Sequence, residues 1–151
     1  NGNRFVMEIN IRKGTIEEVI ALSKKVPEFF QPYSEKTYEE RLSDVPHLIL
    51  IATVGNKPVG FKVGYRRYGH DIFYSWMGGV LDEYRRKGIA TKLAESQEAW
   101  AKTNGFVKVT FKTRNSLSKM IHFGLNRGFM IVDLIKKGEV KDYRIVMEKV
   151  L

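Results

Sequence analysis

The chain contains no cysteine, only three histidines and no long apolar run. Without cysteine it can form no disulfide, no thiolate metal site and no cysteine acyl intermediate, and a reducing cytoplasm is compatible with that composition. The histidines are scattered, without the spacing of metal ligands. No segment approaches the roughly 20 apolar residues of a membrane helix, and the N-terminus lacks the apolar core of a secretory signal. We therefore expect a cytoplasmic protein with no membrane segment and no metal ion.

Positive charge is in excess along the chain. Lysine and arginine number 26 against 17 acidic residues, which gives a net charge of +9 over 151 residues. Such a balance suits an anionic partner: nucleic acid, an anionic membrane surface or a phosphorylated cofactor. The basic pairs Arg66-Arg67 and Lys136-Lys137 fit nucleic acid, but no helix-turn-helix, RNA-binding sheet motif or zinc pattern accompanies them. Nucleic acid is therefore the less favoured partner.

Apolar periodicity predicts alternating strands and helices. Capping-box patterns at Thr15–Glu18 and Thr37–Glu40 predict two helix starts, and Asn115 or Ser116 is predicted to cap a later helix. Strands are predicted at about 5–12, 48–54, 59–65, 72–80, 107–112, 129–136 and 143–150. Helices are predicted from 16 to near 27, from 37 to about 43, over 91–104 and from about 116 to Gly128. This order fits a mixed sheet with helices on its faces.

A basic loop joins a predicted strand to a predicted helix in the middle of the chain. It consists of Arg85-Arg86-Lys87-Gly88-Ile89-Ala90. The first backbone N–H groups of a helix have no partner within the helix, and together with the positive end of the helix dipole they bind phosphate. Gly88 lets the backbone approach a ligand that a side chain would block, and the cations suit a polyanion. The loop is therefore predicted to bind a phosphate-bearing ligand.

The pattern Arg-x-x-Gly-x-Ala, preceded by Val80-Leu81-Asp82-Glu83-Tyr84, resembles the coenzyme A pyrophosphate loop of the GNAT superfamily of N-acetyltransferases. Asp82 stands where the family commonly has proline. The pair Gly128-Phe129, after the last predicted helix, is similar to the family pattern at that place. The resemblance covers essentially the whole chain. It implies an α/β fold with one GNAT-like domain over residues 1–151, built on a mixed, mostly antiparallel sheet of about seven strands with helices on both faces.

The resemblance implies that acetyl-CoA is the cosubstrate, with its pyrophosphate on the backbone of 86–91 and its pantetheine beside the strand that ends at Val80. Two adjacent glycines at a strand end suggest a close backbone approach, or an edge bulge without a ligand. Asn115 matches a family position that contacts pantetheine, and a helix cap is its alternative role. The predicted cofactor-binding residues are Gly78, Gly79, Val80, Arg85, Arg86, Lys87, Gly88, Ile89, Ala90, Thr91 and Asn115.

Without a cysteine, an amine is expected to attack bound acetyl-CoA directly in a ternary complex. A lysine-type amine has a pKa of about 10.4, so a base or a water chain must accept its proton. The two strand positions where family members carry a catalytic glutamate hold Tyr74 and Thr110. The helix position of the usual general-acid tyrosine holds His122 or Gly124, depending on the end from which it is counted. Tyr74 and His122 are therefore the predicted catalytic residues, with solvent as the alternative.

The acceptor is predicted to be a primary amine of a small molecule or of a protein, because the fold does not choose between them. The aromatic residues Phe29, Phe30, Tyr33 and Tyr38 are predicted either to wall the acceptor site or to pack in the core. The sequence leaves a homodimer open. Because the usual carboxylate and tyrosine are missing, a coenzyme A sensor without catalysis is the second function considered, ahead of a nucleic-acid-binding module.

Overall fold

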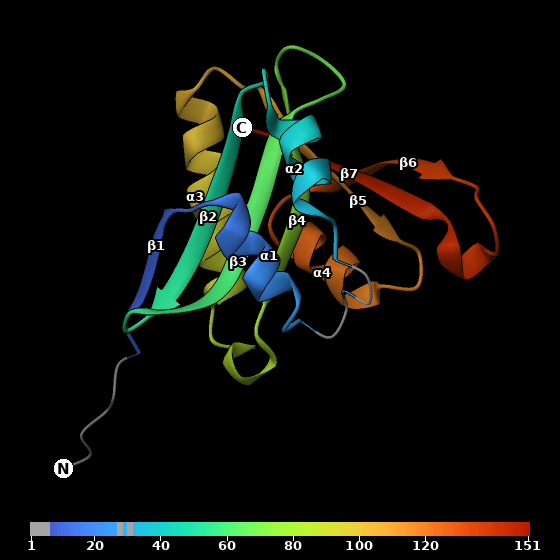
Figure 1. Cartoon of the computed structure of the whole chain (residues 1–151). Helices are drawn as coiled ribbons and strands as arrows, with labels where there is room; N and C mark the ends of the chain where they lie inside the picture. The colour runs from blue at the N-terminus through green and yellow to red at the C-terminus, as the bar shows by residue number, and fades with distance from the viewer. Residues whose placement is uncertain (1–6, 27–28, 30–31) are drawn as a thin grey trace. The chain divides into compact units, whose positions relative to one another are not determined.

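The computed structural model describes residues 7–26, 29 and 32–151. Seven strands pair in the order β1-β2-β3-β4-β5-β7-β6 (Figure 1). The sheet is mixed, because β4 and β5 run parallel whereas β5 and β7, like β6 and β7, run antiparallel. This confirms the expected GNAT-like α/β fold with a mixed sheet of about seven strands. Phe5, in the first predicted strand, and Phe30 lie outside the described residues.

The strands are β1 (Ile9–Lys13), β2 (His47–Val54), β3 (Lys57–Arg66), β4 (Ile72–Val80), β5 (Lys108–Arg114), β6 (Met130–Ile135) and β7 (Arg144–Val150). The helices are α1 (Ile16–Ser23), α2 (Glu35–Leu42), α3 (Ile89–Thr103) and α4 (Ser118–Asn126), with short 3-10 turns η1 (Asp82–Tyr84) and η2 (Val140–Asp142). None of these helices, in the ranges that the structure describes, is long and apolar enough to cross a membrane.

The chain divides into two compact units. The first consists of residues 1–64 and 77–97, and the second of residues 65–76 and 98–151. The first unit therefore holds the end of β4, the basic loop and the start of α3, whereas the second holds the start of β4, the end of α3 and everything that follows. One domain over residues 1–151 stays a prediction.

Two helices of the first unit begin at side-chain caps. The predicted capping box of α1 is confirmed: Thr15 Oγ1 accepts from Glu18 N at 3.2 Å, and Glu18 Oε1 accepts from Thr15 N at 3.2 Å. The predicted start of α2 at Thr37 is wrong. The N-cap is Ser34, whose Oγ accepts from Thr37 N at 3.3 Å. Ser34 adopts the extended conformation that an N-cap requires, so the helix gains a turn before Thr37.

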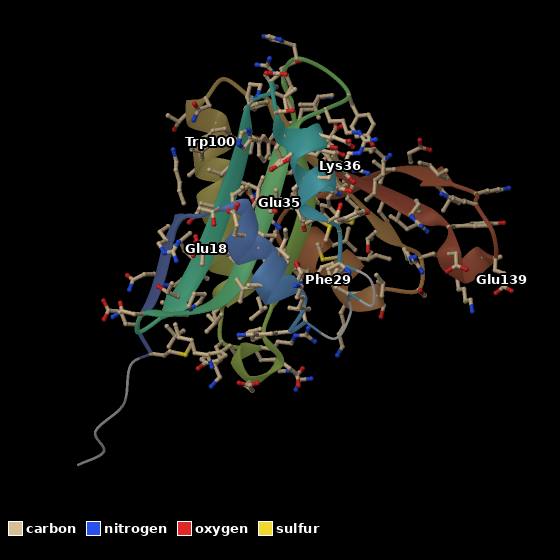
Figure 2. All side chains as sticks on the ribbon, viewed as in Figure 1. Glu18, Phe29, Glu35, Lys36, Trp100 and Glu139 are labelled. Carbon is tan, nitrogen blue, oxygen red and sulfur yellow. The ribbon has the colours of Figure 1, made fainter. Side chains whose placement is uncertain are left out.

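Helices lie on both faces of the sheet in the first unit (Figure 1). A Cβ on Gly60 of β3 would lie 3.3 Å from Ile89 and 3.4 Å from Leu93, so this face packs closely on α3. The next residue, Phe61, is fully buried and points to the other face. There its ring centroid lies 6.0 Å from that of Phe29, which follows α1 and is labelled in Figure 2.

The second unit has an aromatic core beside the end of α3. The ring of Phe73 on β4 lies 5.5 Å from Trp100 of α3 and 5.1 Å from Phe106, measured between centroids. Phe73 is completely buried, and burial of a side chain of this size stabilises the fold by about 1.5–3 kcal/mol. The start of β4 is thereby fixed against α3.

Helix α4 packs on β5 and β7 through a glycine. A Cβ on Gly124 would lie 2.8 Å from Phe111 Cζ and 3.0 Å from Met147 Cε, so no larger residue fits. Gly124 is therefore a packing position that has no room for a tyrosine. The predicted side-chain cap of α4 is wrong: the N-cap is Leu117, and it makes no side-chain cap hydrogen bond.

Candidate cofactor loop and catalytic residues

The basic loop starts from a firmly held strand end. Leu81, directly after β4, donates its backbone N–H to Val59 O on β3 at 2.8 Å. The 3-10 turn η1 follows, and Arg85 N donates to Asp82 O at 3.2 Å. The chain therefore enters the loop in one defined direction.

Two residues of the loop adopt left-handed backbone conformations. Arg86 has φ 60° and Gly88 has φ 83°. Left-handed residues alternating with others turn successive N–H groups toward a common point, an arrangement that binds anions. The first hydrogen bond of α3 runs from Lys92 N to Gly88 O at 3.1 Å, which makes Gly88 the N-cap. A non-glycine residue at φ 60° costs roughly 1 kcal/mol, so the loop holds Arg86 against its intrinsic preference.

The backbone N–H groups from Arg86 to Thr91 donate no hydrogen bond to an acceptor in the described part of the chain. They are six consecutive donors, and Arg86, Lys87 and Gly88 are exposed. A Cβ on Gly88 would meet no atom within 4 Å, so the space in front of the loop is open. Unpaired donors at the positive end of a helix attract an oxyanion.

The cations of the loop divide into two kinds. Arg85 is half-buried: its Nε donates to Val80 O at 3.2 Å, and its Nη1 lies 3.5 Å from the carboxylate of Asp82. Arg85 therefore fixes the loop to the end of β4. Arg86 and Lys87 are exposed, and their charges are available to a polyanion. The sequence pattern could not distinguish the fixing arginine from the other two cations.

The two glycines near the end of β4 differ in their surroundings. A Cβ on Gly79 would lie 3.1 Å from Phe61 and 3.3 Å from Phe29, tighter than ordinary contact, so packing alone requires a small residue there. A Cβ on Gly78 would lie 3.4 Å from Phe61 O, an ordinary contact, and Gly78 is exposed. Internal packing thus accounts for Gly79 and leaves Gly78 without such a reason.

The other predicted residues belong to the second unit. Asn115 does not cap α4; its Nδ2 donates to Val140 O at 3.1 Å and so fastens the loop after β5 to η2. His122 is exposed and lines a shallow depression on α4 together with Ser118, Lys119, Phe123 and Asn126. Tyr74 is only 7% exposed, and its ring packs edge-on against Tyr65 and Tyr68. Tyr74 and His122 therefore occupy very different environments.

Carboxylates do not replace the missing glutamate in the second unit. Thr110, at one of the two expected positions, is buried and donates its Oγ1 to Met147 O at 3.0 Å. Glu98 is 12% exposed by its side chain and forms ion pairs with Arg127 at 2.6 Å and with Lys149. Each of its two oxygens is thereby paired with a cation. No group of three or more metal-ligating side chains occurs among the residues that the structure describes.

Sequence reasoning missed an aromatic and cationic cluster of the second unit, formed by Tyr65, Arg67, Tyr68, Tyr74 and Lys112. Arg67 Nη1 donates to Tyr65 Oη at 3.2 Å, and Lys112 Nζ lies 4.6 Å from the centroid of the Tyr68 ring. The run Tyr65-Arg66-Arg67-Tyr68 was the available signal. The charges of this run fit the less favoured nucleic-acid partner, and Lys112, which completes the cluster, lies far along the chain on β5.

Comparisons with known proteins agree with this geometry. The model of the acetyltransferase (GNAT) family matches residues 16–129, which is more than half of the chain. The structure resembles the ribosomal-protein-S18-alanine N-acetyltransferase of Escherichia coli, with a TM-score of 0.81 and 17% identity over 95% of this chain and 94% of that one. No curated protein matched the sequence.

Two further similar structures contain the cofactor. A GNAT family acetyltransferase from Elizabethkingia anophelis with acetyl-CoA bound has a TM-score of 0.75 and 18% identity, over 95% of this chain and 98% of that one. PaiA N-acetyltransferase from Thermoplasma acidophilum, in complex with coenzyme A, has a TM-score of 0.73 and 21% identity, over 96% and 100%. At these identities the likeness shows the fold, and the family model shows the membership. The chain belongs to the acetyltransferase (GNAT) family.

Proposed function

We propose that this chain transfers an acetyl group from acetyl-CoA to a primary amine by direct attack in a ternary complex. The observation that carries the proposal is the open row of N–H donors from Arg86 to Thr91, at the start of a helix and beside two exposed cations. Membership of the acetyltransferase family supports the reaction class. Acetyl-CoA is then the cosubstrate, and a small molecule or a protein supplies the amine.

The proposal gives the loop the pyrophosphate of the cofactor. The N–H groups of Arg86 to Thr91 donate to its oxygens, with Gly88 leaving room for close approach. The segment Gly78–Val80 receives the pantetheine arm, and a backbone N–H near Val80 polarises the thioester carbonyl. Asn115 stays a predicted pantetheine contact through amide atoms other than the N–H that it donates to Val140.

The chemical step needs a neutral amine and a proton for the departing thiolate. The amine nitrogen forms a bond to the carbonyl carbon, the carbon–sulfur bond breaks, and the proton lost by nitrogen must reach solvent or a base. We assign the general-acid role to Tyr74, because it lies on β4, the strand that leads into Gly78–Val80. His122 is the competing candidate, and an exposed imidazole can exchange protons with solvent.

Cofactor binding is the first test. Acetyl-CoA or coenzyme A should raise the melting temperature, because a ligand that binds only the native state stabilises it. An unchanged melting temperature at saturating cofactor would refute the central claim. Strong duplex binding with a steep salt dependence and no response to cofactor would favour the nucleic-acid module instead.

Turnover is the second test. Release of free thiol with a broad panel of primary amines should rise with pH as the free amine fraction grows. Tyr74→Phe should lower kcat by roughly 10²–10⁴-fold with unchanged cofactor affinity, whereas His122→Ala should have little effect. The reverse pattern would assign the proton to His122, and normal turnover by both variants would assign it to solvent. Cofactor binding without turnover of any amine would leave the coenzyme A sensor as the function.

A further inference from the structure

The second unit contains a connected set of aromatic rings around the start of β4. Tyr74 contacts Tyr65 with centroids 5.7 Å apart and Tyr68 with centroids 5.5 Å apart, both nearly perpendicular. Tyr65 also meets Trp76 edge-on at 5.7 Å. Tyr65 and Tyr74 are 6% and 7% exposed, whereas Tyr68 is 51% exposed. The set thus has a buried floor and one accessible ring.

Two cations lie on the accessible ring. Arg67 Cζ is 4.7 Å from the Tyr68 centroid and 5.3 Å from that of Tyr74, and Lys112 Nζ is 4.6 Å from the Tyr68 centroid. Neither cation forms an ion pair with a carboxylate of the described residues. Because the two distances to this one centroid are 4.7 Å and 4.6 Å, the two positive charges lie at most 9.3 Å apart (4.7 + 4.6). Their mutual repulsion falls when an oxyanion binds between or above them.

Two carboxylates on the strands beyond β5 have contacts of their own. Glu148 of β7 is opposite Thr110 in the register, and it forms an ion pair with Lys108 at 3.2 Å. Asp133 of β6 is separated from Lys112 by the whole of β7, and its Oδ1 accepts from Leu134 N at 2.8 Å. Glu148 and Asp133 therefore form no ion pair with Arg67 or Lys112.

The backbone of the cluster is strained where the ring is exposed. Tyr68 has φ 67°, a left-handed conformation that a bulky residue rarely adopts. The turn that holds it is closed by Arg67 N to Ile72 O and by Ile72 N to Gly69 O, both at 3.4 Å. Glycine would adopt this conformation without strain. Tyr68 is 51% exposed, so burial repays little of the strain, and the left-handed conformation holds the ring against Tyr74 and beside Arg67 and Lys112.

We infer that Tyr65, Arg67, Tyr68, Tyr74 and Lys112 form a binding site for an oxyanion, a carboxylate or a phosphate, carried by the acceptor amine. The anion receives the charges of Arg67 and Lys112 over a floor of low polarity, where an ion pair is stronger than in water. Tyr65 Oη accepts from Arg67, so its own proton is free for a second acceptor. The assignment to the acceptor rests on the proposed acetyl transfer, because Tyr74 and Trp76 lie on the strand that leads into Gly78–Val80.

The anion site can be tested without turnover. Propionate and inorganic phosphate are titrated into the full chain in the absence of cofactor, and tyrosine and tryptophan fluorescence and the melting temperature are followed. We expect a saturable response to propionate in the wild type that Arg67→Leu and Lys112→Met each abolish. The response to phosphate, to which the open donors of Arg86 to Thr91 also contribute, should decrease in both variants. Lys102→Met, an exposed lysine at the end of α3, removes the same charge elsewhere and should keep the response. No saturable response in the wild type, or an unchanged one in both site variants, would overturn the site.

The link to the acceptor is tested with amines that differ only in the anionic group. Pairs are 4-aminobutyrate with butylamine and phosphoethanolamine with ethanolamine, and thiol release from acetyl-CoA is measured. The anionic member of at least one pair should have a KM about 10-fold lower, and Lys112→Met should remove that difference while Lys102→Met keeps it. A preference within the first pair identifies a carboxylate as the bound group, and a preference within the second pair identifies a phosphate. Equal KM values within both pairs would overturn the link to the acceptor.

Failure of the proposed acetyl transfer and failure of the anion site give different results. If no amine releases thiol and acetyl-CoA leaves the melting temperature unchanged, the acetyl-transfer proposal fails, while a saturable anion response that Lys112→Met abolishes still supports the anion site. If transfer occurs and the anion response is absent, the acetyl-transfer proposal stands and the anion site is wrong.

Discussion

Helices α3 and α4 begin in different ways, and they differ in how the backbone N–H groups before the helix are used. Each helix follows a strand of the sheet through a short loop, and each must satisfy the first backbone N–H groups of the helix. Before α4, the loop donors are used internally: Asn115 N donates to Tyr143 O at 2.8 Å, Ser116 N to Lys141 O at 3.0 Å and Leu117 N to Arg114 O at 3.0 Å. Before α3, the donors of the loop are open. The same local architecture can therefore close on itself or present a binding surface.

The residues of each loop and the carbonyl groups near it explain why the starts of α3 and α4 differ. The α3 loop carries a glycine and a left-handed arginine, which turn the backbone outward, whereas the loop before α4 meets carbonyl groups of the η2 region. Helix α1 shows a third solution, because the side chains of Thr15 and Glu18 close its start. A strand–loop–helix motif consequently predicts an anion site only when the N–H groups of the loop have no internal acceptor.

The largest effect is expected from Gly88→Asp, which places a carboxylate in the open row of donors. Coenzyme A affinity should fall about 100-fold or more, through charge repulsion and through the loss of close backbone approach. Gly105→Asp is a matched control, because Gly105 has φ 87° and open space around it, as Gly88 does with φ 83°. Both variants should lose similar stability. Calorimetric titration that finds equal cofactor affinity in the two would show that strain, and not the site, is measured.

A smaller effect is expected from Arg86→Gly, which removes a charge and keeps the loop backbone. Coenzyme A affinity should fall about 5- to 10-fold, and its dependence on salt should weaken. Stability should rise slightly, because glycine adopts φ 60° without strain. Affinity at two salt concentrations, together with the urea midpoint, checks both parts. Unchanged affinity would mean that backbone donors alone hold the pyrophosphate.

Asn115→Ala tests the closed start of α4. Removing the hydrogen bond to Val140 O should lower the free energy of unfolding by about 1 kcal/mol. Coenzyme A affinity discriminates between the two roles predicted for Asn115. A decrease of several-fold supports contact with pantetheine, whereas an unchanged value leaves Asn115 as a loop fastener alone.

The smallest effect is a pH dependence at the start of α1. The hydrogen bond from Arg12 is the main reason that the pKa of Glu18 lies below its ordinary value of 4.5. A lowered pKa means that the pair contributes stability above the unfolded-state pKa and loses it as pH falls through the folded-state pKa. Because both side chains are partly exposed, the contribution is about 0.5 kcal/mol. The difference in urea midpoint between wild type and Glu18→Gln, whose position is labelled in Figure 2, should disappear in acid. A constant difference would exclude this linkage.

Local chemistry made part of the molecule predictable from the sequence. The loop Arg85–Ala90 combines its charges and its glycine within six residues, so its place between a strand and a helix was predictable, while its cofactor-binding role stays a prediction. The start of α1 was predictable for the same reason. The start of α2 was not, because Ser34 and Thr37 are both good N-caps and the local sequence does not choose between them.

Features that depend on distant residues were not predictable. Gly124 owes its identity to Phe111 and Met147, and neither lies near it in the sequence. The cluster around Tyr68 joins three strands and a turn, so its separate parts looked like unrelated basic and aromatic residues. Arg85 fixes the loop because its side chain donates to Val80 O. The sequence motif shows the charge of Arg85 but does not show which carbonyl its side chain contacts.

The hydrogen bond from Arg85 Nε to Val80 O bears on the length of the ligand that the loop accepts. Because Leu81 is bonded to β3 and Arg85 is bonded back to the strand end, the segment from Val80 to Arg85 is a spacer of fixed length. If the pyrophosphate is held at one end of this spacer and the thioester at the other, the spacer selects a cofactor by the length of its arm as well as by its charge. Coenzyme A analogues with an arm shortened or lengthened by one methylene should therefore bind at the loop and present the acetyl group out of register with the acceptor.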